Sequence, residues 1–581
     1  GKLIEQEKIK EGLSKEEAFK YAEAVTTYLA VALMKFTDYN NVVNLWNPGS
    51  WSWNKVAHSL SMRGIAMQWN WCEISPFTDL PLSYWGALKN AVNGLNYLVS
   101  CGGISIKLSN IKLISSKAVR VLLDDATILS KLQGDEKFDL IVTDPPYYDD
   151  VPYAELSDFF YVWLKRALSD VKNDELKPRF VPEAFFEKVN DNWIEISTQW
   201  ERYALSEVSL NPPRLGPSAD KTAGVRHFQN LLNASFTSMA SRLKDNGLLI
   251  TYYAHSDPDA WKALLEAGWE AAKLMVTNAF PITTEYTLSV VKRGKLSMDT
   301  SIIVVWRKGV RGSVDASELY GEMVEEASRR ARELIDLGAV GRDLIIGTLA
   351  AALAVATRYE EVRVMGRVDV RSLVDRYVYP AALLGLARAL ARRAELREDV
   401  RSPDAMFYLI VKFALSGAKR KILESTDARI FSIGTSLDLN AALKTWRILR
   451  AGEGEGGAKV AKAKTLMLVE PMSADRSKLA ELLEAKGVGI TEPKIRCSVD
   501  ALHVLEYYAL VYSREEFRRR LDELKAKFPA QVEEALSMVK IMARVLPDRD
   551  VEKGLCVRVV EYLEPRLSKL TSYMGGDVGG S

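Results

Sequence analysis

Short apolar runs alternate with helical patterns in the middle of the chain. Helical spacing covers residues 158–168 and a segment that ends near Lys244, and Ser256, Asp257 and Pro258 are expected to open another helix. Strand-like runs lie at residues 138–143, 248–253, 273–278 and 301–306. Such alternation predicts an α/β fold with a largely parallel sheet covered on both faces, whose ligands bind at the carboxyl ends of the strands.

The chain on either side of this region has a different pattern. Helices are predicted over residues 15–35 and 85–98, and β-rich runs follow at residues 104–108 and 118–123. Within the middle region, Asp245, Asn246 and Gly247 are expected to end the helix that closes near Lys244, with Gly247 in a left-handed conformation. Beyond about Gly312, patterns rich in Ala, Leu, Arg and Glu predict a mainly helical C-terminal region with a glycine-rich linker near residues 451–457.

Composition restricts the classes of protein that fit this pattern. The 581 residues, 48% hydrophobic and 27% charged, predict a soluble globular chain of two or three domains, and a net charge of +2 neither supports nor excludes nucleic acid. The four cysteines form no Cys-x-x-Cys pair, which argues against a zinc ribbon and a disulfide framework. Residues 344–357 are too short an apolar run for a bilayer and predict a buried helix, and no secretion leader is recognised, so we expect a cytoplasmic protein without a membrane partner.

The sharpest chemical signal is the string Asp144-Pro145-Pro146-Tyr147, which directly follows the strand-like run at residues 138–143. Neither proline has an N–H group, so the Pro145 carbonyl is available to face a ligand. Asp144 and that carbonyl can accept both hydrogens of an exocyclic NH₂ group, and Tyr147 offers a ring for an extruded base. The alternative is a Pro-Pro turn in which Asp144 acts as a local cap, but the chemistry of the whole string favours an amino-methylating site.

With its extension through Tyr148 to Leu164, this string resembles the signature of the large archaeal and bacterial adenine-specific DNA methylases, some of which carry a zinc ribbon. Similar stretches lie near Thr37, at Asp125-Ala126-Thr127, near Ala254-His255, at residues 281–285, and at residues 356–359 and 500–503. The resemblance implies a Rossmann-like class I methyltransferase sheet, possibly incomplete, and S-adenosylmethionine as cofactor. It implies a helical, aromatic-rich segment at residues 1–84 packing on the catalytic domain, the catalytic domain at 85–311 with a DNA-facing insertion near 170–224, and a helical region at 312–581.

The resemblance also assigns roles to single residues. Asp144, Pro145, Pro146 and Tyr147 match the positions that bind the target amino group, and Asp144 also stands beside the cofactor. Asp125 matches an acidic position near the adenosine part of the cofactor, where a carboxylate can accept from a ribose hydroxyl or an amino group. The alternative for Asp125 is a helix or turn cap.

One element expected from the resemblance is missing from this sequence. Such enzymes need a glycine-rich loop where bare backbone approaches the cofactor, and Cys101-Gly102-Gly103 lacks the required spacing. The hypothesis is therefore that a protein partner, or an N-terminal part not included here, carries that loop.

Other candidates for binding are weaker. Tyr148, Arg226 and His255 are candidates for contact with substrate or DNA, although a lone histidine such as His227 or His255 is more often a structural hydrogen-bonding group. Packing is the favoured interpretation for the tryptophans, although stacking on bases is the alternative; they are Trp46, Trp51, Trp53, Trp69 and Trp71. The basic residues of the predicted DNA-facing insertion are Lys172, Lys177, Arg179, Lys188, Arg202, Arg214 and Lys221.

The sequence as a whole favours S-adenosylmethionine-dependent methylation of the N6 amino group of adenine in double-stranded DNA, within a modification or defence system. The alternative is a noncatalytic DNA-binding or assembly subunit of such a system. Methylation of cytosine N4 or of RNA shares the same chemistry and stays open.

Overall fold

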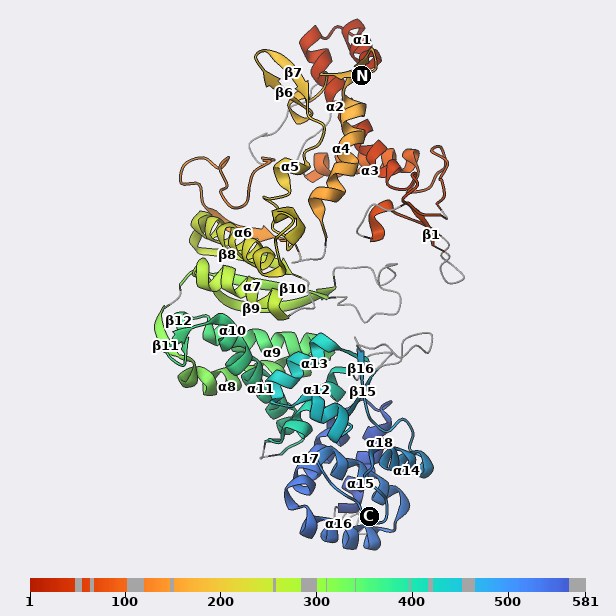
Figure 1. Ribbon diagram of the computed structural model, residues 1–581, viewed down its shortest axis with the longest axis vertical. Coiled ribbons are helices and arrows are strands. Elements are labelled where there is room, and N and C mark those ends of the chain that lie inside the picture. The colour runs from red at the N-terminus through yellow and green to blue at the C-terminus, as the bar shows by residue number, and fades with distance from the viewer. Residues whose placement is uncertain are drawn as a thin grey trace, which may run out of the picture. The chain divides into compact units, whose positions relative to one another are not determined.

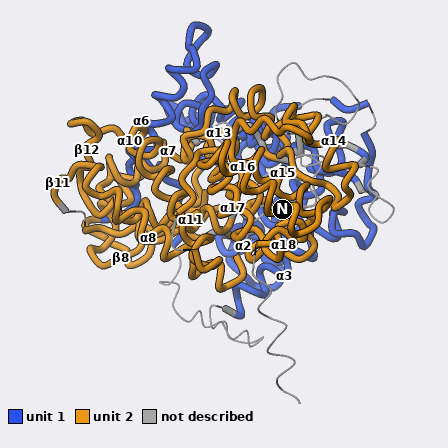
Figure 2. Tube along the Cα trace, turned by 90° about the horizontal axis from the view of Figure 1, so that it is seen from below, with its two compact units in different colours: residues 1–133, 146–234, 286–295 blue, residues 134–145, 235–285, 296–581 orange. Residues whose placement is uncertain are grey.

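The computed structural model describes residues 1–47, 55–62, 67–69, 71–101, 120–146, 151–253, 258–283, 300–309, 311–339, 341–396, 399–415, 422–451 and 465–563. The chain divides into two compact units (Figure 2). Unit 1 comprises residues 1–133, 146–234 and 286–295, and unit 2 comprises residues 134–145, 235–285 and 296–581. Unit 2 therefore continues through the boundary predicted near residue 312.

Unit 1 is built from helices with small β-hairpins (Figure 1). Its longer helices are α1 (Lys2–Lys10), α2 (Lys15–Thr37), α3 (Tyr84–Cys101) and α4 (Tyr153–Leu168). The hydroxyl of Ser14 accepts from the Glu17 N–H at 3.2 Å while the Glu17 carboxylate accepts from the Ser14 N–H, a capping box that starts α2 where the sequence predicts it. The core of unit 1 gathers α2, α4 and the segment after α4 around Ala22, Ala30, Leu168, Phe180, Phe185 and Phe186.

The stretch at residues 170–224, predicted as a DNA-facing insertion, contains two tight hairpins. Strands β4 (Asp170–Lys172) and β5 (Glu175–Lys177) pair across Asn173-Asp174, and β6 (Phe186–Val189) and β7 (Asn192–Glu195) pair across Asn190-Asp191. All four turn residues have φ between 47° and 63°. Two successive positive φ angles are the mark of the type I′ turn, whose twist matches that of paired strands. Short elements complete unit 1: β1 (Leu45–Asn47), β2 (Lys55–Ala57), η1 (Ser59–Met62), η2 (Pro182–Ala184), α5 (Trp200–Tyr203) and η3 (Pro212–Leu215).

Unit 2 contains a four-stranded sheet in the order β3-β8-β10-β9. Its strands are β3 (Phe138–Thr143), β8 (Leu243–Tyr253), β9 (Met275–Thr283) and β10 (Thr300–Arg307). Strand β3 runs parallel to β8, but β10 is antiparallel to both β8 and β9, so the expectation of a largely parallel sheet is wrong and the sheet is mixed. The three remaining strands share one direction, because β10 lies between β8 and β9 and opposes both.

The segment Asp245-Asn246-Gly247 does not cap α6 (Lys221–Arg242) as expected. Strand β8 begins at Leu243, and the pairing of β3 with β8 is irregular between Leu243 and Leu248, so Asp245, Asn246 and Gly247 form a bulge rather than a left-handed helix cap. A Cβ on Gly247 would lie 3.1 Å from the Asp139 carbonyl oxygen, which explains the glycine by close approach of the two backbones.

Helices pack against the sheet and continue into the C-terminal part of unit 2. Phe236 of α6 meets the buried Trp306 of β10 edge to face, and α7 (Pro258–Leu265) leads into a π-helical turn, η4 (Glu266–Ala271). The expected buried helix at 344–357 is confirmed as α9 (Gly341–Ala356). The mainly helical C-terminal region is also confirmed, with α8 (Ala316–Asp336), α10 (Val370–Leu373), η6 (Val374–Val378), α11 (Tyr379–Arg393), α12 (Pro403–Leu415), α13 (Ser425–Thr435), η7 (Ala441–Thr445), α14 (Arg476–Lys486), α15 (Ser498–Val511), α16 (Arg514–Lys527), α17 (Pro529–Val545) and α18 (Val551–Leu563).

Two small sheets interrupt these helices. Strand β11 (Arg311–Asp315) pairs in parallel with β12 (Tyr359–Val364), which pairs with β13 (Arg367–Val368). Strands β14 (Ile422–Glu424), β15 (Leu449–Ala451) and β16 (Thr465–Leu468) form an antiparallel sheet with β16 in the middle. The greater part of the predicted glycine-rich linker, after Ala451, lies outside the described residues. Within the described part of the chain, no helix combines the length and the apolar character needed to cross a bilayer.

The contact between η4 and β10 allows a test of the packing. A Cβ on Gly268 would lie 2.6 Å from the ring of Trp306, which is fully buried, so the ring or η4 would have to shift. We expect Gly268→Ala to lower the free energy of unfolding by about 1–3 kcal/mol through overpacking. The matched control is Gly321→Ala in α8, where nothing lies within 4 Å and alanine should raise stability by about 0.5–1 kcal/mol. Urea denaturation of both variants measures the two changes, and equal effects would contradict the packing.

Candidate functional site

The carboxyl end of β3 presents the predicted amino-binding residues. Thr143 is in register with Thr251 of the parallel strand β8, and Asp144, Pro145 and Pro146 follow directly without regular secondary structure. Asp144 is exposed, whereas both prolines are half-buried. Tyr147, Tyr148 and His255 lie outside the described residues, so their predicted roles stay predictions.

Strand β3 forms one edge of the described part of its sheet. Its side chains Leu140 and Val142 are 52% and 55% exposed, although the strand is apolar. Parallel strands of α/β sheets are normally covered on both faces, and edge strands normally carry protecting charges or irregularities. The sequence of β3 is therefore that of an interior strand placed at an edge.

Asp125 lies in a turn in unit 1. Its Oδ1 atom accepts from the N–H of Thr127 at 2.8 Å and from the Thr127 hydroxyl at 2.6 Å, so Asp125 does cap a turn. The neighbouring Asp124 accepts from the N–H of Lys131 and the hydroxyl of Ser130, and these bonds hold the pKa of Asp124 below its usual value. Asp125 belongs to unit 1 and Asp144 to unit 2, so a joint site stays a prediction.

The turn with Asp125 borders a cavity of about 880 Å³ within unit 1. The walls come from residues 123–131, from the first turns of α4, and from residues 202–208. They combine carboxylates, hydroxyls, two cationic side chains and aromatic rings, including Asp125, Ser130, Lys131, Tyr153, Ser157, Phe160, Arg202, Tyr203 and Glu207. Cavities of this size and mixed lining suit a small polar ligand that carries a flat ring.

The same wall contains hydrogen bonds and ion pairs that hold the start of α4 in place. Helix α4 has Pro152 as its N-cap, without a side-chain cap of its own, and the Glu207 carboxylate accepts instead from the N–H groups of Tyr153 at 3.2 Å and Ala154 at 2.6 Å. Arg214, which is nearly buried, donates to both Glu207 and Glu155. An acidic group at a helix N-terminus is favourable, and here it ties the insertion to the helix that follows the Asp-Pro-Pro-Tyr string.

Several residues near the predicted DNA-facing surface make polar contacts within unit 1. His227 Nε2 lies 2.9 Å from the Leu205 carbonyl oxygen, which agrees with a structural histidine, whereas Arg226 is exposed on α6. Among the basic residues of the insertion, Lys177, Arg179, Lys188 and Arg214 form ion pairs with acidic side chains of unit 1. These pairs reduce the charge that the insertion could offer to phosphate groups.

The tryptophans of unit 1 are more exposed than their interpretation as packing residues implies. Trp69 is 93% exposed, so that interpretation is wrong for it, and Trp46 and Trp71 are 40% and 44% exposed. The N–H of Gln68 donates to the Val42 carbonyl, and the buried Asn44 side chain bonds both backbone groups of Cys72, so a described hydrogen-bonded scaffold flanks Trp69 and Trp71. Trp51 and Trp53 lie outside the described residues.

A second cluster of chemically active side chains, which sequence reasoning missed, is buried among the C-terminal helices of unit 2. Lys412 of α12 contacts three carboxylates: Glu470, Asp550 at 3.0 Å and Glu552 at 2.6 Å. Burial opposes its charge, but these carboxylates outweigh that effect and hold the pKa of Lys412 above its usual value. Burial likewise opposes the charge of Glu552, yet Lys412 and His503 lower the pKa of Glu552 to about 2.

His503, Glu506 and Glu552 are close enough together to suggest a metal site, with candidate ligand atoms within 4.8 Å of one another. The hydrogen bonds of His503 argue against that use. Lys486 Nζ lies 3.2 Å from His503 Nδ1 and 3.0 Å from Asp500. An ammonium group only donates, so Nδ1 accepts and the proton of the neutral ring is on Nε2, which faces Tyr408 and Glu552. Nε2 then has no lone pair for a metal, and Lys412 already supplies the cation beside Glu552.

Glu506 of α15 completes this cluster. Burial and then the charge of Glu552 raise the pKa of Glu506 well above its usual value, and the Cys556 thiol donates to its Oε1 at 3.4 Å. Its other oxygen has no hydrogen-bond partner among the described residues. The arrangement is best understood as a structural ion-pair network. The sequence signal was only a His-x-x-Glu spacing on one helix, because its partners come from distant helices.

No family model, curated protein or solved structure matches this chain.

The buried network predicts the effect of removing its cation. Lys412→Met leaves three buried carboxylates without their shared partner, and we expect a loss of about 3–5 kcal/mol in the free energy of unfolding. Lys478→Met is the control, because the Lys478–Glu481 pair is about two-thirds exposed and screened by water, so its loss should change stability far less. Guanidinium denaturation compares them, and a small loss for Lys412→Met would show that the network is not stabilising.

His503 should make stability depend on pH. Burial and then the Lys486 charge lower the pKa of His503 from 6.5 to about 4, so between these pH values the unfolded chain binds a proton that the folded chain does not. Stability should therefore fall as the pH drops from 6.5 to 4, by up to about 3 kcal/mol from this residue. His503→Gln should flatten that part of the profile in chemical denaturation at a series of pH values. A slope that stays the same in the variant would assign the effect to other groups.

Proposed function

We propose that this chain supplies the base-binding half of an S-adenosylmethionine-dependent DNA methyltransferase that acts on the N6 amino group of adenine. The observation that carries the proposal is the position of Asp144, Pro145 and Pro146 at the carboxyl end of β3, beside the parallel strand β8. Open α/β sheets bind their ligands at that edge. The resemblance of the Asp-Pro-Pro-Tyr string to adenine-specific methylases points to the same chemistry.

The chemistry of the string suits an exocyclic amino group. The Asp144 carboxylate and the Pro145 carbonyl are acceptors, so together they can hold both hydrogens of an NH₂ group and direct its lone pair away from the ring plane. Tyr147 would stack on the extruded adenine. When bound, S-adenosylmethionine would supply an electrophilic methyl group, toward which Asp144 and Pro145 would hold the amino nitrogen; the nitrogen would take the methyl as its bond to sulfur breaks and would release a proton to solvent.

The cavity beside Asp125 fits part of the cofactor in chemical terms. Its carboxylates and hydroxyls can bond ribose hydroxyls or an adenine amino group, and Phe160 offers a flat apolar surface. The capping bonds of Asp125 both use Oδ1, which is compatible with a ligand contact through the other oxygen.

The exposed edge of β3 supports a role for a partner. In the described sheet β3 is hydrogen-bonded on one side only, so its open edge is suited to pairing with another strand, while the half-exposed Leu140 and Val142 leave an apolar surface on one face of the strand. An element that carries the glycine-rich cofactor loop would extend the sheet at this edge, cover that face and bring the cofactor next to Asp144. We propose that this element belongs to a protein partner or to an N-terminal part of a longer chain, with double-stranded DNA as substrate in a modification or defence system.

The proposal predicts methyl transfer that depends on Asp144. Labelled methyl transfer from S-adenosylmethionine to unmodified genomic DNA should appear when the chain is combined with its genomic neighbour or studied within its longer parent. Asp144→Ala should reduce that rate at least about 100-fold, because the amino group loses its orientation. Asp139→Ala is the matched control, since Asp139 lies on the same strand, is exposed, and pairs only with Lys244 in the described contacts.

The outcome also separates the alternatives. Transfer lost with Asp144→Ala and kept with Asp139→Ala supports a methyltransferase, and analysis of the methylated nucleoside distinguishes adenine N6 from cytosine N4. Absence of Asp144-dependent transfer in every combination would favour the noncatalytic DNA-binding or assembly subunit.

A further inference from the structure

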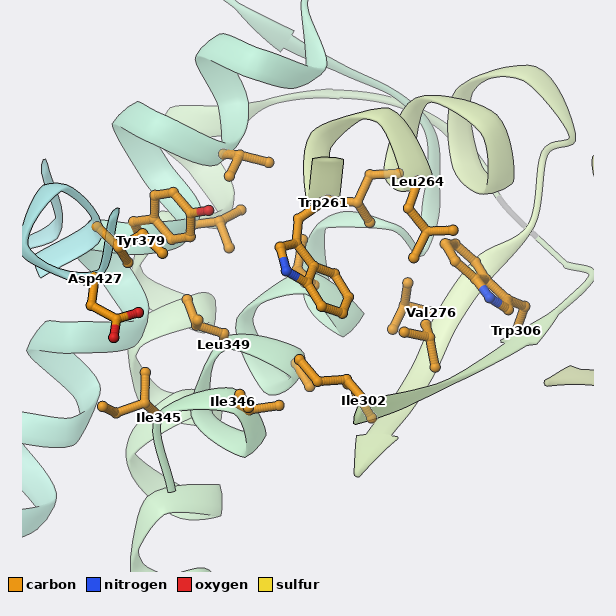
Figure 3. Close-up of a pocket in the computed structure, with 18 of the residues that line it drawn as sticks. Trp261, Leu264, Val276, Ile302, Trp306, Ile345, Ile346, Leu349, Tyr379 and Asp427 are labelled. Carbon is orange, nitrogen blue, oxygen red and sulfur yellow. The ribbon is translucent and has the colours of Figure 1, made fainter. Parts of the chain in front are cut away.

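A cavity of about 140 Å³ lies inside unit 2, between the sheet and the helices that follow it in sequence (Figure 3). Strands β9 and β10 and helix α7 form one part of its described wall, and α9, η6, α11 and α13 form the rest. Asp144 and Asp125 are not among the lining residues, so the cavity does not belong to the proposed methyl-transfer site.

Few of the described lining side chains carry a polar atom. They are Trp261, Trp306, Tyr379 and Asp427. The indole N–H of Trp306 donates to the Thr251 hydroxyl at 3.2 Å, and Asp427 and Tyr379 each have an interaction partner. Asp427 is therefore not an unpaired charge that would attract a ligand. The rest of the described wall is made of methyl, methylene and aromatic ring surface.

Several apolar side chains of the wall keep part of their surface uncovered. Trp261, Ile346, Leu349, Leu353 and Ile430 are half-buried, although they line the interior of the unit. Figure 3 shows Trp261 and Leu349 in the middle of the lining residues. Covering apolar surface of this kind lowers the free energy, because that surface is removed from water.

The size and lining decide what can occupy this space. Protein interiors are packed as closely as organic crystals, and an apolar cavity of about 150 Å³ stays dry and accepts a benzene-sized molecule, because water needs two to four polar partners. Two wall positions, Ala279 and Ala350, carry only a methyl group, and a larger side chain at either position would fill part of the space. A charged or hydroxylated molecule would lose hydrogen bonds to water that this wall does not replace.

We propose that this cavity binds a small, neutral and wholly apolar molecule of about the size of benzene. The ligand would pack against the ring of Trp261 and the side chain of Leu349. Its contacts would reach β9, β10 and α7 on one side and α9 and η6 on the other. Occupancy would therefore hold the sheet against the helices, and a ligand that binds only the folded chain raises its stability.

Three probes of one shape test the inference on the full chain. Ethylbenzene is neutral and apolar, whereas benzyl alcohol and benzylammonium replace its terminal methyl group by a hydroxyl and by an ammonium group. Isothermal titration should show ethylbenzene binding at least about 10-fold more tightly than either, because the wall cannot compensate the desolvation of the polar groups. Triisopropylbenzene, which is too large for the cavity, should not bind. Equal binding of ethylbenzene and benzylammonium, or binding of triisopropylbenzene, would overturn the proposal.

Variants that fill the cavity test where the probe binds. Ala350→Leu should weaken ethylbenzene binding at least about 10-fold, and the control Ala526→Leu, at an exposed position of α16 outside the lining, should leave it within about 2-fold. Ala279→Val is a smaller change that a strand accommodates, so it serves if Ala350→Leu does not fold, and it should weaken binding at least about 3-fold. Unchanged affinity in a folded cavity-filling variant, or no binding of ethylbenzene to the unmodified chain, would contradict the inference.

Discussion

The parallel pairing of β3 with β8 is the constraint on which the proposed site depends. Residues 134–145 join unit 2, while the chain on both sides of them, up to residue 133 and from 146 to 234, belongs to unit 1. The register from Leu140–Leu248 to Thr143–Thr251 is what anchors this short segment to the sheet. Strand β3 ends at Thr143, and the division between the units falls between Pro145 and Pro146, neither of which has an N–H group to continue the ladder. The same two prolines therefore end the strand, mark the passage between units and free the carbonyl that the proposed chemistry uses.

The C-terminal helices show how the fold handles charge away from water. Lys412 and its three carboxylates, with Lys486, Asp500 and His503 beside them, form one connected network rather than isolated pairs. Taking such charges out of water costs several kcal/mol per ion, so each partner is needed by the others. The network joins α12, α14, α15 and α18, whose apolar faces already share a core. Its requirement for matched partners favours this packing of the helices over alternatives that would separate the charges.

How much the sequence could predict depended on the range of the interactions involved. Helix α2 was predictable because Ser14 and Glu17 form a local capping box, and α9 because its apolar run is bounded by charges. The direction of β10 was not, since the residues before it do not reveal whether the chain returns alongside β9. The hairpins at Asn173-Asp174 and Asn190-Asp191 did carry a signal, because Asn and Asp tolerate positive φ, but this stretch was predicted only as a DNA-facing insertion, without strands.

The candidate sites also differ in how far apart in the sequence their residues lie. The Asp-Pro-Pro string was visible because its chemistry lies in consecutive residues, whereas His503 acquires its tautomer only from Lys486 and Glu552 on other helices. The apolar cavity has no sequence signal, because its wall comes from seven separate elements.

The exposure of strand β3 and the missing glycine-rich loop are independent observations that both favour a partner element beside Asp144. The loop is missing from the sequence, and its absence alone is equally compatible with a chain that never binds a cofactor. Leu140 and Val142 are both more than half exposed on one face of β3, and a chain evolved to act alone would be expected to cover such an apolar face. Lys244 and Asp139 place an ion pair at the amino end of β3, whereas Leu140 and Val142 lie closer to Asp144. The exposed apolar face is thus next to the proposed chemistry, which favours a covering partner element there over a noncatalytic surface.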